Sequence, residues 1–213
     1  MSDFHLLTIS AVQSHIGPVI ATYLGANRFA EVKPLHWVDS KDAPVRRVFA
    51  YAQLKGGVIA PRWGYSFDFV PHLVAGKMQW HRTEKSAIFD AFVDGQSEEL
   101  NLSYMRGERG LLESMTLRLS NAVRQAQDFW QSGGQATSVY EQVVALSNRP
   151  GAGMYTQLPV AVAFCHALSG REEDARRAME AYIDRGKPRE DTVPKLWAAL
   201  DVALDSGLRP QTV

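Results

Sequence analysis

Three side chains within residues 62–83, RWGYSFDFVPHLVAGKMQWHRT, are able to support chemistry: Asp68, His72 and His81. A carboxylate that orients an imidazole forms an acid–base pair, and one Asp with two His could bind a divalent metal ion. Their spacing matches neither HxH nor HExxH, the patterns that indicate a metal site most directly. We therefore treat the three residues as candidate catalytic residues and assign no metal site.

A hairpin must position these residues. If Ala75 and Gly76 form its loop, His72 lies opposite Gln79 and Val70 lies opposite His81. Side chains alternate between the two faces of a strand, so one face is predicted to be polar and the other aromatic. The polar face would hold Ser66, Asp68, Val70, His72, Gln79, His81 and Thr83. The aromatic face would hold Phe67, Phe69, Leu73, Met78, Trp80 and Arg82. We expect the aromatic face to be core, and the polar face to be either solvated surface or a site.

A second hairpin is predicted at Gly56 and Gly57, since both glycines can adopt positive φ. The same alternation then places Arg47 opposite Ser66. It also places Tyr51 opposite Arg62 on the polar face. A one-residue bulge in this hairpin would move these side chains to the other face of the sheet. The candidate binding residues are Arg47, Tyr51, Arg62 and Gln79.

The elements around these hairpins predict an α+β fold. An N-terminal helix that begins near Ser2 or Asp3 and ends at Gly25 precedes a small antiparallel β-meander, and the C-terminal half is helical. Apolar periodicity and capping residues predict helices over 83–94, 107–130, 137–148, 158–170, 171–186 and 193–207. We divide the chain into a mixed region, 1–95, and a helical region, 96–213, which could also form one continuous domain.

Residues 161–186 resemble one tetratricopeptide-type helix pair, with an aromatic residue in the first helix and Gly170 at the turn. A solenoid needs about three such repeats, and the sequence contains no convincing second copy. We interpret the stretch as an ordinary helical hairpin.

Composition excludes several classes of function. Of 213 residues, 46% are hydrophobic, and 23 Lys and Arg balance 23 Asp and Glu, so no bulk charge attracts nucleic acid. The single cysteine, Cys165, excludes an internal disulfide framework, and its apolar surroundings predict an inert buried thiol. No cofactor motif, membrane-length apolar run or secretory leader is recognised. We expect a cytoplasmic protein without a cofactor, whose partner is another protein and not a membrane; a small RNA or DNA contact through the arginine-rich edge of the sheet is a weaker third possibility.

Two classes of function stay open. The first is a non-catalytic protein-binding module, such as a bacterial inhibitor or immunity-type protein, because aromatic and arginine side chains dominate interface hot spots. The alternative is a small enzyme, for example a metal-assisted hydrolase, that uses Asp68, His72 and His81.

Overall fold

In a computed structural model, the chain packs as two compact units, and each unit is assembled from two separate segments. Unit 1 comprises Met1–Tyr65 and Phe92–Gln131, and unit 2 comprises Ser66–Ala91 and Ser132–Val213. The predicted regions 1–95 and 96–213 therefore both contribute to both units, and the residues at their boundary lie outside the described part of the chain. The structure describes residues 6–25, 28–74, 77–94, 103–105, 107–132, 136–149, 157–186 and 188–206.

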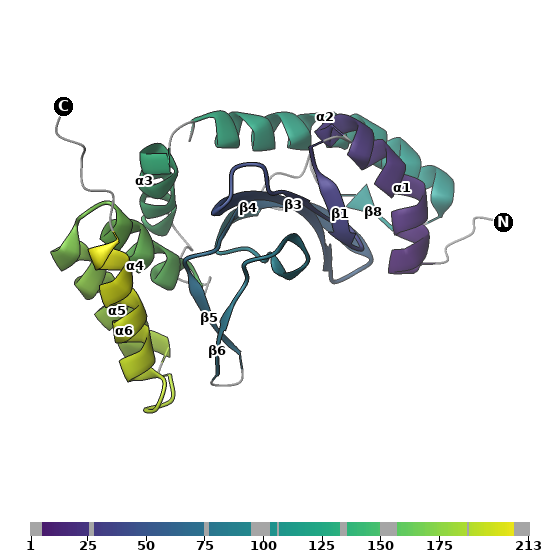
Figure 1. The fold of residues 1–213 in the computed structure, drawn as a ribbon. Helices are drawn as coiled ribbons and strands as arrows, with labels where there is room; N and C mark the ends of the chain where they lie inside the picture. The colour runs from purple at the N-terminus through teal and green to yellow at the C-terminus, as the bar shows by residue number, and fades with distance from the viewer. Residues whose placement is uncertain are drawn as a thin grey trace. The chain divides into compact units, whose positions relative to one another are not determined.

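The main antiparallel sheet (Figure 1) is built largely from unit 1 and confirms the predicted α+β class. Its strands run in the order β1-β2-β3-β4-β7, and β8 also pairs with β4. The bounds are β1 Ala30–Lys33, β2 His36–Asp39, β3 Val45–Leu54, β4 Val58–Phe67, β7 Ala91–Asp94 and β8 Ser103–Tyr104. The predicted hairpin between β3 and β4 is confirmed, and both glycines have positive φ, 82° at Gly56 and 70° at Gly57.

Residues 31–40, which were expected to be extended, lie in another hairpin, β1–β2. Leu35 turns the chain with a φ of 58°, a conformation that a branched side chain seldom adopts. The Glu31 carboxylate supports this turn, because its Oε1 atom accepts a hydrogen bond from the backbone N–H of Leu35 at 3.0 Å. A shift of register between Glu31 and Lys33 marks a bulge at the edge of the sheet.

Two helices lie on one side of this sheet: α1, Ile9–Leu24, and α2, Glu108–Ser132 (Figure 1). Helix α1 begins later than predicted, at an N-cap Thr8 whose side chain accepts from the Ala11 N–H; Ser2 and Asp3 lie outside the described residues. It buries Val12, Ile16, Ile20 and Leu24, a stripe of four-residue steps. From α2, Trp130 packs its ring 5.3 Å from that of Phe29 and donates its indole N–H to the Gly64 carbonyl.

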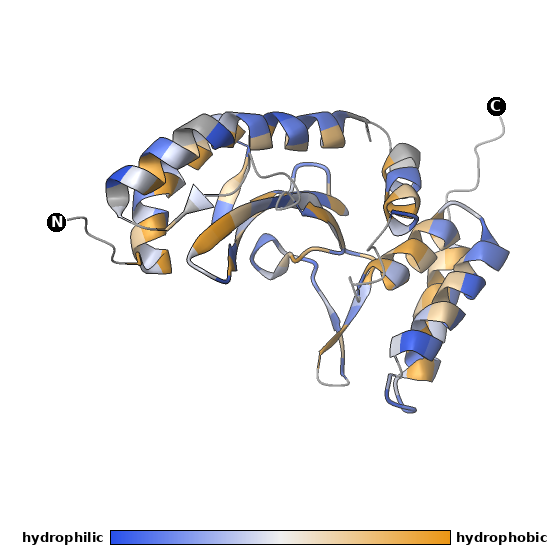
Figure 2. Ribbon diagram, turned by 180° about the vertical axis from the view of Figure 1, so that it is seen from behind, coloured by the Kyte–Doolittle hydropathy of each residue, from blue (hydrophilic) through white to orange (hydrophobic). Residues whose placement is uncertain are grey.

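Unit 2 contains a helical bundle and a short hairpin. Helix α4, Leu158–Leu168, packs against α3, Ala136–Ser147, α5, Glu172–Gly186, and α6, Val193–Asp205. Because α4 is mostly apolar (Figure 2) and nine of its eleven residues are buried, it forms the centre of the bundle. These helices confirm the prediction for the C-terminal half. Among the helices in the described ranges, none has the length and apolar character needed to cross a membrane.

The hairpin of unit 2 confirms one predicted register and corrects the sheet to which it was assigned. Strands β5, Pro71–Val74, and β6, Lys77–Trp80, pair with His72 opposite Gln79, as predicted, although Ala75 and Gly76 themselves lie outside the described residues. They form a separate two-stranded sheet, because a turn after Phe67 interrupts the long strand expected over 58–73.

The predicted helix over 83–94 is wrong. Thr83 does act as an N-cap and forms a capping box with Ser86, but the resulting 3₁₀ turn, Glu84–Ser86, ends at Ala87. Ala87 has extended backbone angles, and the chain continues into β7. The local start signal is real, and pairing with the sheet replaces the helix that it would otherwise begin.

Candidate functional site

One of the two predicted histidines, His72, contacts a buried carboxylate, and this carboxylate belongs to Asp90 and not to Asp68. The Nε2 atom of His72 lies 2.7 Å from Oδ1 of Asp90, and the two side chains are only 5% and 0% exposed. The distance is that of a charge-assisted hydrogen bond, although the ring N–H is not well directed at the oxygen. We call the two residues the His72–Asp90 pair.

Burial dominates the electrostatics of this pair. Loss of hydration raises the pKa of Asp90, while the contact with His72 and a 2.7 Å hydrogen bond from the Phe67 N–H act in the opposite direction. Burial, with a smaller contribution from the charge of Asp90, also raises the pKa of Cys165 well above its ordinary value. Cys165 is thus a protonated, fully buried thiol, in agreement with its predicted inertness.

The structure brings His72 and His81 together, with ring centroids 4.4 Å apart in an edge-to-face arrangement. Gln79 faces His72 across the hairpin and is exposed. Asp68 is half-buried, and its backbone carbonyl accepts a hydrogen bond from Arg82 Nε. Within the described ranges, no group of three or more His, Cys, Asp or Glu side chains is arranged to hold a metal ion.

The other predicted binding residues belong to unit 1, whereas Asp68, His72, Gln79 and His81 belong to unit 2. Arg47 approaches Asp42 at 3.4 Å. Tyr51 is buried, and loss of hydration raises the pKa of its hydroxyl. Arg62 binds Asp94 at 3.0 Å and lies over the Phe92 ring, 5.2 Å from its centroid. These contacts give Arg47 and Arg62 partners inside the fold.

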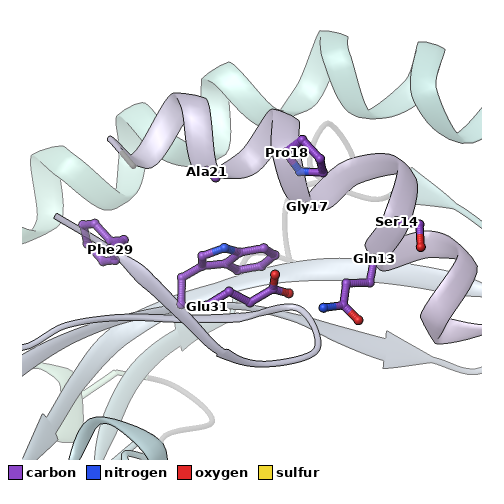
Figure 3. Close-up of a pocket in the computed structure, with 8 residues that line it drawn as sticks. Gln13, Ser14, Gly17, Pro18, Ala21, Phe29 and Glu31 are labelled. Carbon is purple, nitrogen blue, oxygen red and sulfur yellow. The ribbon is translucent and has the colours of Figure 1, made fainter. Parts of the chain in front are cut away.

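An open groove in unit 1 is the second candidate site, and sequence reasoning missed it. It lies between α1 and the β1–β2 hairpin (Figure 3) and has a volume of about 490 Å³. Eight residues line it: Gln13, Ser14, Gly17, Pro18 and Ala21 from α1, and Phe29, Glu31 and Trp37 from the hairpin and the segment before it. We call it the α1 groove.

The local sequence of α1 opens this groove. Gly17 has no side chain, and a Cβ atom placed there would lie 3.7 Å from the Glu31 Oε2 atom, in the space between helix and strand. Pro18 has no N–H, so the carbonyl of Ser14 loses its usual helical donor. The Gly-Pro pair inside an apolar helical pattern was the available sequence signal for this feature.

The floor of the α1 groove is aromatic and its rim is polar. Phe29 and Trp37 are buried and are held by neighbouring rings, Phe29 by Trp130 and Trp37 by Phe49 at 6.5 Å. Glu31 is exposed at the rim. Among the eight lining residues, only Glu31 carries a charge. The groove therefore combines a fixed apolar surface with one carboxylate.

Comparison of the chain with protein-family models, with curated proteins and with solved structures finds no match.

Proposed function

We propose that the protein is a non-catalytic protein-binding module and that the α1 groove contacts its partner. The observation that carries the proposal is an open groove with an aromatic floor and a polar rim. Pockets for small ligands bury about 70–90% of the ligand surface, whereas an open groove suits a side chain or a short segment presented by a larger molecule. An apolar centre surrounded by a polar rim is also the arrangement found at protein–protein interfaces.

The arrangement of unit 2 does not favour the alternative, a small enzyme built on Asp68, His72 and His81. General acid–base catalysis requires the titrating group to reach a proton on the substrate. His72 is 5% exposed and Asp90 is 0% exposed, so the protein itself surrounds both groups. The His72–Asp90 pair fits a structural role better, as an internal polar contact of unit 2.

Photocrosslinking tests the proposed interface. A benzoylphenylalanine residue replaces Ser14, which is exposed at the rim of the groove, and a control chain carries it at Glu180, which is exposed on α5. Irradiation in the source cell should give one discrete adduct from position 14 and not from position 180. Adding Ala21→Trp, which fills the groove, should abolish that adduct while the circular dichroism spectrum stays unchanged.

An adduct that survives Ala21→Trp, or no adduct from position 14, would contradict the proposal. The more specific proposal is that the protein is an inhibitor or immunity-type protein, and it requires one further result. Purified protein should lower the activity of the crosslinked partner, and the Ala21→Trp variant should not.

A further inference from the structure

The charge and shape of the α1 groove indicate what kind of group it accepts. Glu31 is its one charged lining residue, and within the described part of the chain the Glu31 carboxylate has no ion-pair partner. Its Oε1 atom already accepts from the Leu35 N–H at 3.0 Å. The Oε2 atom faces α1, at 3.7 Å from the position that a Cβ on Gly17 would occupy. One carboxylate oxygen is thus committed to the fold and the other is directed into the groove.

The side-chain amide of Gln13 lines the same groove near this carboxylate (Figure 3), and its oxygen can accept a hydrogen bond. None of the eight lining residues is Lys, Arg or His. The polar part of the groove therefore offers negative charge and acceptor oxygens to a group that donates hydrogen bonds.

The remaining wall suits the apolar stem of a basic side chain. Ala21 is half-buried and offers carbon surface at this wall, while Phe29 and Trp37, which are 7% and 1% exposed, close the floor and are held by their ring contacts before any ligand arrives. Basic side chains pack their methylene groups on such surfaces while the charged end reaches an acceptor, and guanidinium groups also stack on aromatic faces.

We propose that the α1 groove accepts an arginine or lysine side chain of the partner protein, with the cation at Glu31 and the methylene stem beside Ala21, above the closed aromatic floor. This inference depends on the proposed function, because it specifies the chemistry of the partner at the same site. It makes Glu31 the residue that determines specificity in the groove.

The test uses two small probes on the full-length, ¹⁵N-labelled protein: acetyl-arginine methylamide, and acetyl-citrulline methylamide as its neutral analogue. The arginine probe should shift the amide signals of Gly17 and Glu31 and the indole signal of Trp37, and it should bind about fivefold more tightly than the citrulline probe, the scale of one exposed ion pair. Added salt should weaken the arginine probe more than the citrulline probe.

Glu31→Gln is the matched variant, because the glutamine carbonyl can still accept from the Leu35 N–H and preserve the turn. It should remove the fivefold preference for arginine. Glu113→Gln, at an exposed position of α2 that pairs with Arg109, makes the same change of charge outside the groove and should leave the preference intact.

Equal binding of the two probes, no shifts with either probe at millimolar concentration, or an unchanged preference in Glu31→Gln would overturn the inference. These results are separable from failure of the proposed function. If Ala21→Trp abolishes the crosslink while Glu31→Gln leaves it unchanged, the groove is an interface whose occupant is not cationic.

Discussion

At the scale of single residues, the buried carboxyl of Asp90 makes the stability of the protein depend on pH. Burial raises its pKa from the ordinary value of 3.8 in the folded state. The folded protein therefore retains a proton on Asp90 at pH values where the unfolded chain has already released it. The stability that this carboxyl contributes is fully present below its unfolded pKa and is lost as the pH rises through the folded pKa.

Asp90→Asn should remove this dependence, because the amide does not titrate. We expect the free energy of unfolding of the wild type, measured relative to Asp90→Asn by urea denaturation, to fall as the pH is raised from about 4 to about 7. Repeating the comparison in a His72→Gln background removes the contact between Asp90 and His72 from the difference. A difference that rises with pH would show that the contact with His72 outweighs burial.

The sequence predicted the position of His72 in its hairpin but not its contact with Asp90. Strand alternation and the hairpin loop were enough to pair His72 with Gln79 correctly, because both signals are local. The same alternation could not identify Asp90 as the partner of His72, since Asp90 comes from segment 83–94, which was predicted to be a helix. The buried environment of His72 comes from long-range packing within unit 2, which no local pattern encodes.

At the scale of elements, Pro18 lowers the stability of helix α1 and also shapes the α1 groove. Proline inside a helix removes a hydrogen bond and clashes with the preceding turn, at a cost of about 3 kcal/mol. Pro18 is exposed, so its replacement loses little packing. The same residue lines the groove, and its missing N–H leaves the Ser14 carbonyl without a helical donor.

Pro18→Ala should therefore stabilise the protein by about 1–3 kcal/mol and weaken binding at the groove. Thermal unfolding measures the first effect, and the yield of the position-14 crosslink measures the second. Pro194→Ala is the matched control, because Pro194 lies in the first turn of α6, where proline is accommodated. That control should show no gain in stability. Loss of stability in Pro18→Ala would mean that the proline ring contributes packing to the fold.

Helices and hairpins with strong local signals were predictable, and strands that pair only with residues distant in sequence were not. The five helices from α2 to α6 follow apolar periodicity and terminal Pro or Gly residues, and they appear close to their predicted ranges. The segment 83–94 contains an equally clear capping box, yet only one 3₁₀ turn forms. Its last four residues, Ala91–Asp94, pair in the sheet as β7, a contact with residues distant in sequence.

At the scale of the whole molecule, each compact unit joins segments that are distant in the sequence. Within unit 2, Gln157 Nε2 donates to the Pro71 carbonyl at 2.9 Å, and the Phe69 and Tyr140 rings meet edge to face at 5.8 Å. Segment 66–91 therefore depends on the helices of the C-terminal half for its partners. A domain boundary drawn at one position in the sequence could not reproduce this arrangement, because the chain enters unit 2 twice.

This organisation predicts which amides lose protection together when one core is weakened. Phe164 is 1% exposed in α4, and Phe164→Leu should destabilise unit 2 by about 1 kcal/mol. Native-state hydrogen exchange should then be faster in β5 and β6 as well as in α4 and α5, although about 80 residues of sequence separate the hairpin from these helices.

The reciprocal variant Phe49→Leu, at a fully buried position of β3, should accelerate exchange mainly in β2, β3 and α1. If Phe164→Leu left β5 and β6 as protected as in the wild type, the hairpin would not share a cooperative unit with the helices, because amides within one such unit open together.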